Sequence, residues 1–284
     1  MPVLKSTSDV ELATYDFGGS GPTLVISHAT GFHANVYRSL ATQLEARYHC
    51  VALDYRAHGD STTPAGDDFH WHGYGHDATI FAANLATRPL FGFGHSMGGA
   101  ALLMAELNAP GTFAGLVIFE PIVLPAAHEI PAGQDNLLAA GARRRRSTFD
   151  SFDAAFGNYR AKPPLSGWDT DALRDYVDHG FRSLGDGSVT LKCVSEHEAL
   201  TFEMGGTHGT FERLAEIACP VLVLAGNLSS PGPAAAAALV AHNLPHGSYK
   251  QFDHLTHFGP MEAPALIAQT IAEYFSGLSQ ALND

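Results

Sequence analysis

Short apolar runs that alternate with helical stretches constrain this chain more than any other feature of its sequence. Thr23–His28, Leu90–His95 and Val221–Gly226 are mostly apolar throughout, a pattern typical of strands that are buried on both faces. Helical patterns and glycine-containing turns lie between such runs. This alternation predicts an α/β fold, in which a mostly parallel sheet is flanked by helices.

Further strands and helices follow from the same patterns. The other predicted strands are Leu12–Phe17, His49–Tyr55, Phe113–Glu120 and Ser248–Phe252, the first of them antiparallel. The predicted core helices are Asn35–Arg47, Gly73–Ala86, Met97–Leu107, a helix that begins in the alanine run at Ala234, and Ala263–Ser276.

The alternation stops between Leu124 and Ala218, where no run has the pattern of a buried strand. Helices are predicted there over Asn136–Ser147 and Thr170–Leu184. We therefore expect a core of residues 1–123 and 219–284 with a mainly helical cap insertion over 124–218, because connections of this length are usually functional. The arginine run Arg143–Arg146 is interpreted as a solvated helix face, with an anion-attracting rim as the alternative.

Composition excludes several classes of protein. With 16 Lys and Arg against 29 Asp and Glu, the net charge of −13 argues against binding to nucleic acid or to an anionic membrane surface. No apolar run approaches the ~20 residues of a membrane span, and the N-terminus lacks the apolar segment of a secretory signal. Three scattered cysteines do not form a disulfide framework or a zinc site. A cytoplasmic location with reduced, core-packing thiols is expected.

The segment Gly94-His95-Ser96-Met97-Gly98 joins an apolar strand to an alanine-rich and leucine-rich helix. In a G-x-S-x-G turn of this kind, small residues on both sides let the backbones pass, and the serine hydroxyl is exposed above the sheet. The helix N-terminus at this point also stabilises negative charge. Ser96 is therefore the candidate nucleophile.

With this motif in place, the chain resembles the α/β-hydrolase superfamily from about Glu11 to Phe275. The resemblance also rests on Ser27–Phe32 (SHATGF), on Leu53–Ser61 (LDYRAHGDS) and on His257–Pro264 (HFGPMEAP). It implies that a backbone N–H after the first of these strands binds the oxyanion of the reaction, together with the N–H of Met97. Because the superfamily glycine is displaced here, the first donor is Ala29 or Thr30.

Among 16 histidines, His257 has the position expected for the catalytic base. It follows the last predicted strand, and the superfamily places its histidine there, last in chain order. His254 is the competing candidate. A histidine that titrates near neutrality suits the transfer of a serine proton to a leaving group.

The acid that orients the histidine is less obvious. The loop Asn227–Pro233 contains no carboxylate, although most relatives carry an Asp there. The resemblance implies Glu120 instead, at the end of the strand after the nucleophile helix, where zearalenone-lactone hydrolases and many haloalkane dehalogenases carry a Glu. Asp253 and Glu198 are the alternatives.

The predicted function is a serine hydrolase that cleaves a carboxylic ester or lactone of a small, mostly apolar molecule through an acyl-enzyme. Hydrolysis of C–C bonds or acyl transfer by the same triad, and a non-catalytic ligand receptor, are the alternatives. No cofactor is expected, and the histidines around His70-Trp71-His72 and His76-Asp77 lack metal-site spacing. The expected partner is a small-molecule substrate, with neither nucleic acid nor membrane. The sequence leaves a homodimer open.

Overall fold

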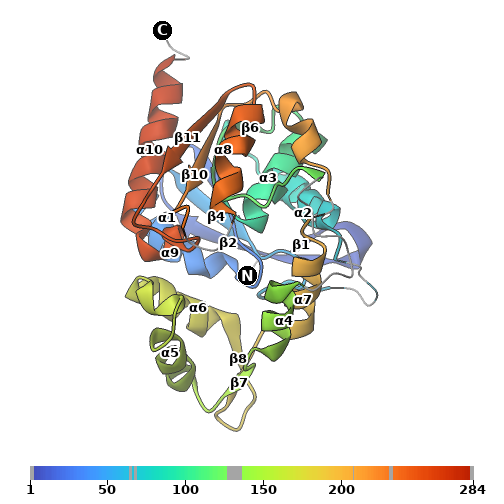
Figure 1. Cartoon of the computed structure of the whole chain (residues 1–284), viewed down its shortest axis with the longest axis vertical. Coiled ribbons are helices and arrows are strands. Elements are labelled where there is room, and N and C mark those ends of the chain that lie inside the picture. Colours follow the sequence, from blue (N-terminus) through green and yellow to red (C-terminus); the bar gives the residue numbers. More distant parts are fainter. Residues whose placement is uncertain are drawn as a thin grey trace.

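A computed structural model describes residues 3–63, 66, 69–126, 136–206, 208–229 and 233–281. Its central feature is an eight-stranded sheet with the order β1-β2-β4-β3-β5-β6-β10-β11 (Figure 1). The strands are β1 Val3–Lys5, β2 Glu11–Gly18, β3 Thr23–Ser27, β4 His49–Leu53, β5 Leu90–His95, β6 Phe113–Phe119, β10 Val221–Ala225 and β11 Gly247–Gln251. Parts of the Asn227–Pro233 loop and of the 124–218 segment lie outside the described residues.

The sheet is parallel from β4 to β11, while β2 pairs antiparallel with both β1 and β4. Every residue of β3, β5 and β10 is buried, as expected for parallel strands covered on both faces. The predicted mostly parallel sheet is thus confirmed. Strand β1 was not predicted, because its three residues are too few to show a periodic pattern.

Helices cover the sheet on both sides (Figure 1). One face carries α1 and α10, and the other carries α2, α3 and α8, with a separate apolar cluster under each set. The bounds are α1 Arg38–Leu44, α2 Trp71–Asn84, α3 Met97–Asn108, α8 Ala234–Asn243, α9 Gly259–Glu262 and α10 Pro264–Ala281. No helix among the described residues has both the length and the apolar character needed to span a bilayer.

Most of the segment between β6 and β10, including its helices, forms a group of elements at one end of the molecule (Figure 1). Its helices are α4 Leu137–Arg144, α5 Phe152–Arg160, α6 Thr170–Gly180 and α7 Ser195–Glu203. Asn136, Ser151 and Asp169 cap the first three by accepting backbone N–H groups of the first turn.

A small antiparallel sheet in this segment corrects the expectation that it contains no buried strand. The strands β7 Thr148–Phe149, β8 Phe181–Ser183 and β9 Val189–Leu191 pair in the order β7-β9-β8. Strand β8 replaces the last turn of the helix predicted over Thr170–Leu184. Strands of two or three residues are too short for a period-two pattern to be recognised.

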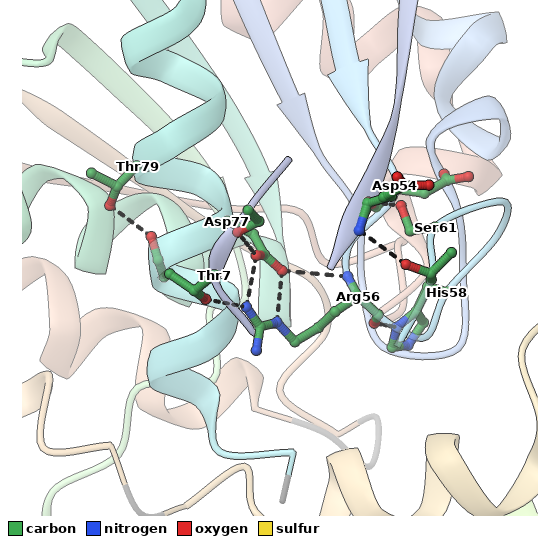
Figure 2. A network of polar contacts seen from close by, with 11 residues as sticks. Thr7, Asp54, Arg56, His58, Ser61, Asp77 and Thr79 are labelled. Carbon is green, nitrogen blue, oxygen red and sulfur yellow. Dashed lines mark hydrogen bonds and ion pairs between the residues drawn. The ribbon is translucent and has the colours of Figure 1, made fainter. Parts of the chain in front are cut away.

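The loop after β4 is held in place by polar contacts at one end of the sheet (Figure 2). The Asp54 carboxylate accepts hydrogen bonds from the backbone N–H groups of Ala34 and Asp60 at 2.7 and 2.8 Å. Arg56 forms a buried ion pair with Asp77 of α2 at 2.9 Å. Ala57 adopts a φ of +62°, a region that favours glycine.

The three cysteines are buried and unpaired. Burial, which disfavours the charged thiolate, raises the pKa of Cys50 and of Cys219 to about 12. Burial also raises the pKa of Cys193. These thiols therefore remain protonated and act as small apolar side chains.

Several histidines are buried in neutral form. Burial lowers the pKa of His33 to about 3, and that of His58 and His208 to about 4. Since an unfolded histidine titrates near pH 6.5, the unfolded chain binds more protons below that pH. Each such histidine therefore contributes stability that is complete above pH 6.5 and declines as the pH falls toward its folded pKa.

His58 allows a test of this linkage. Its Nδ1 lies 2.9 Å from the Arg56 carbonyl oxygen, and the side-chain amide of His58→Asn can donate a similar bond without titrating. Between pH 7.5 and 5.5 the wild type is expected to lose about 1.4 kcal/mol more unfolding free energy than His58→Asn. Urea denaturation at both pH values measures this difference. Equal losses in the two proteins would contradict a buried neutral His58.

Candidate active site

Ser96 occupies the turn between β5 and α3. Its backbone has φ +56° and ψ −118°, a conformation that residues other than glycine seldom adopt. A Cβ atom at Gly94 would lie 2.7 Å from the Gly99 Cα, and one at Gly98 would lie 2.2 Å from the Ser27 carbonyl oxygen. Both glycines are thus required by close backbone approach, and they fix the strained turn that carries Ser96.

Glu120 and His257 form a hydrogen-bonded pair. Glu120 Oε2 lies 2.6 Å from His257 Nδ1, and Glu120 Oε1 accepts the backbone N–H of Gly226 at 2.7 Å. The glutamate is 1% exposed and directly follows β6, while Gly226 directly follows the neighbouring strand β10. The carboxylate is therefore held by one strand end and orients the His257 ring with its second oxygen.

The alternative candidates have other partners. Asp253 Oδ1 accepts a hydrogen bond from Gln251 at 2.6 Å, and Glu198 Oε2 accepts one from Arg145 at 2.6 Å. Among the described residues, neither carboxylate nor His254 is hydrogen-bonded to the Glu120–His257 pair. The geometry thus favours Glu120 as the partner of His257.

Ser96 lies next to the residues that surround His257. In the described part of the chain, no hydrogen bond joins the Ser96 hydroxyl to His257, although the ring of the preceding residue, His95, lies 4.8 Å from the His257 ring. Catalytic hydrogen bonds are often long without substrate and shorten when it binds. The structure therefore brings Glu120 and His257 together and places Ser96 beside them.

A chain of buried hydrogen bonds links the loop after β3 to the loop that carries His257. The N–H of Ala29 donates to the Tyr37 hydroxyl at 3.2 Å, and this hydroxyl lies 2.7 Å from His95 Nδ1. His95 Nε2 lies 2.8 Å from the His257 carbonyl oxygen.

The partners assign the direction of this chain. Burial lowers the pKa of His95 well below its usual value, so the ring is neutral and has one donor and one acceptor nitrogen. A carbonyl oxygen only accepts hydrogen bonds, so Nε2 of the neutral His95 ring carries the ring proton. Nδ1 then accepts a hydrogen bond from the Tyr37 hydroxyl. Tyr37 and His95 thus fix the two loops relative to each other. No sequence pattern marks either residue for this role.

Ala29 and Thr30, the two candidates for the first oxyanion donor, differ in whether their backbone N–H is already hydrogen-bonded. The Ala29 N–H already donates to Tyr37, whereas no described residue accepts the N–H of Thr30 or of Met97. A hydrogen-bond donor for a developing anion must be free and fixed in place. The arrangement favours Thr30 and Met97 over Ala29.

Aromatic side chains surround this end of the sheet. Phe32 contacts the rings of His95, Trp168, Tyr176 and Phe258, with centroids 5.4 to 6.2 Å apart. Two of these rings belong to the segment between β6 and β10. An apolar wall of this kind suits an uncharged substrate.

The aromatic residues Trp71 and Tyr74 after His70 have packing roles. Trp71 and Tyr74 are buried in the core, where each forms a hydrogen bond with Thr201, so they pack α2 against α7. The Asp77 carboxylate is paired with Arg56. Within the described ranges, no three His, Cys, Asp or Glu side chains are placed to share a metal ion.

Tyr37→Phe tests the hydrogen-bond chain. The variant leaves the Ala29 N–H and His95 Nδ1 without their partner in a buried place, so the free energy of unfolding is expected to fall by about 1–3 kcal/mol. Tyr249→Phe is the control, because Tyr249 is exposed and its hydroxyl donates a solvent-exposed hydrogen bond to Gln251, and it should change stability by less than about 0.5 kcal/mol. Equal effects in urea denaturation would show that the Tyr37 hydroxyl is not an essential link.

Known proteins share this architecture and sequence pattern. The chain is 26% identical over 260 residues to the magnesium-chelatase 30 kDa subunit of Rhodobacter capsulatus, covering 84% of this chain and 82% of that protein. It is 23% identical over 270 residues to the pimeloyl-[acyl-carrier protein] methyl ester esterase of Proteus mirabilis, covering 92% and 95%.

Solved structures with the same fold include the E-2-(acetamidomethylene)succinate hydrolase, with a TM-score of 0.78 and 20% identity over 97% of this chain and 100% of that one. The enol-lactonase of Burkholderia xenovorans has a TM-score of 0.71 and 18% identity, covering 97% and 100%. A model of the alpha/beta hydrolase family matches residues 24–270. Because this match spans most of the sequence, the chain belongs to the alpha/beta hydrolase family.

Proposed function

We propose that this protein is a serine hydrolase that cleaves a carboxylic ester or lactone of a small, mostly apolar molecule. The observation that carries the proposal is the 2.6 Å contact between Glu120 and His257 beside the strained turn of Ser96. Similar proteins named as a methyl ester esterase and an enol-lactonase support this reaction class. The aromatic wall around Phe32 supports an apolar substrate.

The first half of the proposed reaction forms an acyl-enzyme. The Ser96 hydroxyl attacks the carbonyl carbon while His257 Nε2 takes its proton, and Nδ1–H stays bonded to Glu120. The N–H groups of Thr30 and Met97 donate to the oxyanion that forms on the carbonyl oxygen. His257 then returns the proton to the leaving alkoxide, and the C–O bond breaks.

In the second half, His257 takes a proton from a water molecule that attacks the acyl carbon. The tetrahedral intermediate collapses, Ser96 regains its proton from His257, and the carboxylic acid is released. The segment between β6 and β10 would act as a cap in this scheme, because its Trp168 and Tyr176 rings contact Phe32 beside the candidate site.

The activated serine is tested by intact-mass analysis after treatment with a fluorophosphonate. The wild type is expected to gain one adduct, because an activated serine displaces fluoride from phosphorus, and Ser96→Ala should gain none. An adduct that persists in Ser96→Ala would place the nucleophile elsewhere. No adduct on either protein would favour a ligand-binding role for the fold.

The acid is tested with Glu120→Gln, compared with Asp253→Asn as the matched control. The glutamine keeps the size of the side chain but cannot stabilise the imidazolium, so kcat for ester hydrolysis should fall by about 10³ to 10⁴-fold. Asp253→Asn should stay within about threefold of the wild type, because its carboxylate faces Gln251. The opposite ranking of the two variants would assign the acid to Asp253.

A further inference from the structure

A buried ion pair in the insertion has no task in the proposed reaction. Glu198 of α7 bonds through Oε2 to Arg145 Nη1 at 2.6 Å, with side-chain exposures of 10% and 17%. Arg145 also donates to the Tyr176 hydroxyl. The other arginines of the Arg143–Arg146 run differ, since Arg143 forms exposed ion pairs on the surface of α7 and Arg146 lies over the Phe149 ring.

The free end of Glu198 points at the loop after β3. A Cβ atom at Gly31 would lie 2.3 Å from Glu198 Oε1, 2.8 Å from Cδ and 3.3 Å from Cγ. Of these three Glu198 atoms, the carboxylate oxygen therefore lies nearest to Gly31. Gly31 follows Thr30 directly, so Oε1 lies against the residue next to the proposed oxyanion donor.

Oε1 of Glu198 is an unused acceptor. In the described part of the chain it accepts no hydrogen bond, while Oε2 is held by Arg145. A buried ion pair contributes little stability compared with apolar residues of similar volume. A role for the Arg145–Glu198 pair at the neighbouring loop after β3 therefore explains its presence better than a contribution to stability does.

We propose that Glu198 is a specificity-determining residue that accepts a hydrogen bond from a hydroxyl group on the carbon next to the scissile carbonyl. The inference rests on the proposed ester hydrolysis and names its substrate class as esters of 2-hydroxy acids. Arg145 fixes the carboxylate and balances its charge next to the developing oxyanion. An ester without a donor at this position leaves the carboxylate unpaired and is a poorer substrate.

The test compares kcat/KM for ethyl 2-hydroxybutyrate, ethyl 2-methoxybutyrate and ethyl butyrate. The methoxy ester keeps an electron-withdrawing oxygen but has no donor, and each rate is divided by the hydroxide-catalysed rate of the same ester. The wild type should prefer the hydroxy ester over both others by about 10- to 100-fold, since the bond involves a charged acceptor. A ratio below threefold would overturn the proposal.

A double variant tests the residue itself. Arg145→Met with Glu198→Leu removes both buried charges, a replacement that proteins often tolerate, and should reduce the preference to about onefold. Arg143→Met with Glu196→Leu is the matched control, because it removes a nearby exposed ion pair between the same two segments of the chain. The control should keep the wild-type preference, and a preference retained without Arg145 and Glu198 would overturn the proposal.

Two further outcomes are distinguishable. If the double variant does not fold, the wild-type ratio decides alone between a hydroxyl preference and none. If no ester is hydrolysed and no fluorophosphonate adduct forms, both the ester hydrolase function and the role of Glu198 are overturned. An adduct with ester turnover but no hydroxyl preference overturns only the role of Glu198.

Discussion

Parallel pairing of β3, β5, β6 and β10 is the constraint on which the candidate site depends. Because these strands run in one direction, their carboxyl ends meet at one edge of the sheet. Ser96 follows β5, Glu120 follows β6 and Gly226 follows β10, so three separate segments converge without a dedicated scaffold. The Glu120 carboxylate reaches Gly226 at the end of the neighbouring strand, so the proposed reaction does not require a carboxylate in the loop after β10.

The two loops around Ser96 are not independent. His95 is buried inside the strand end, and its two nitrogens connect Tyr37 and the His257 carbonyl. A shift of the loop after β3 would be transmitted to the histidine loop through this ring. His95 thus supports the relative position of the proposed oxyanion donors and the proposed base, and a proton-transfer reaction requires such groups to be placed to within a fraction of an ångström.

The sequence was informative where a pattern is local. The alternation of apolar strands and helices predicted the sheet, and the lack of a carboxylate in Asn227–Pro233 directed attention to Glu120. The short strands β7, β8 and β9 were not predicted, because two or three residues are too few to show a periodic pattern. The ion pair of Glu198 with Arg145 and the link between Tyr37 and His95 join residues 53 and 58 positions apart, and no spacing rule connects such pairs before the fold is known.

The buried cysteines have a practical consequence for spectroscopy. Since Cys50, Cys193 and Cys219 are enclosed and protonated, thiol-directed dyes will not modify them in the folded protein. A cysteine substituted for Leu138, which is 63% exposed on α4, would then take up a maleimide fluorophore selectively. No native cysteine would then compete for the label, and the fluorophore would report on the segment between β6 and β10 alone.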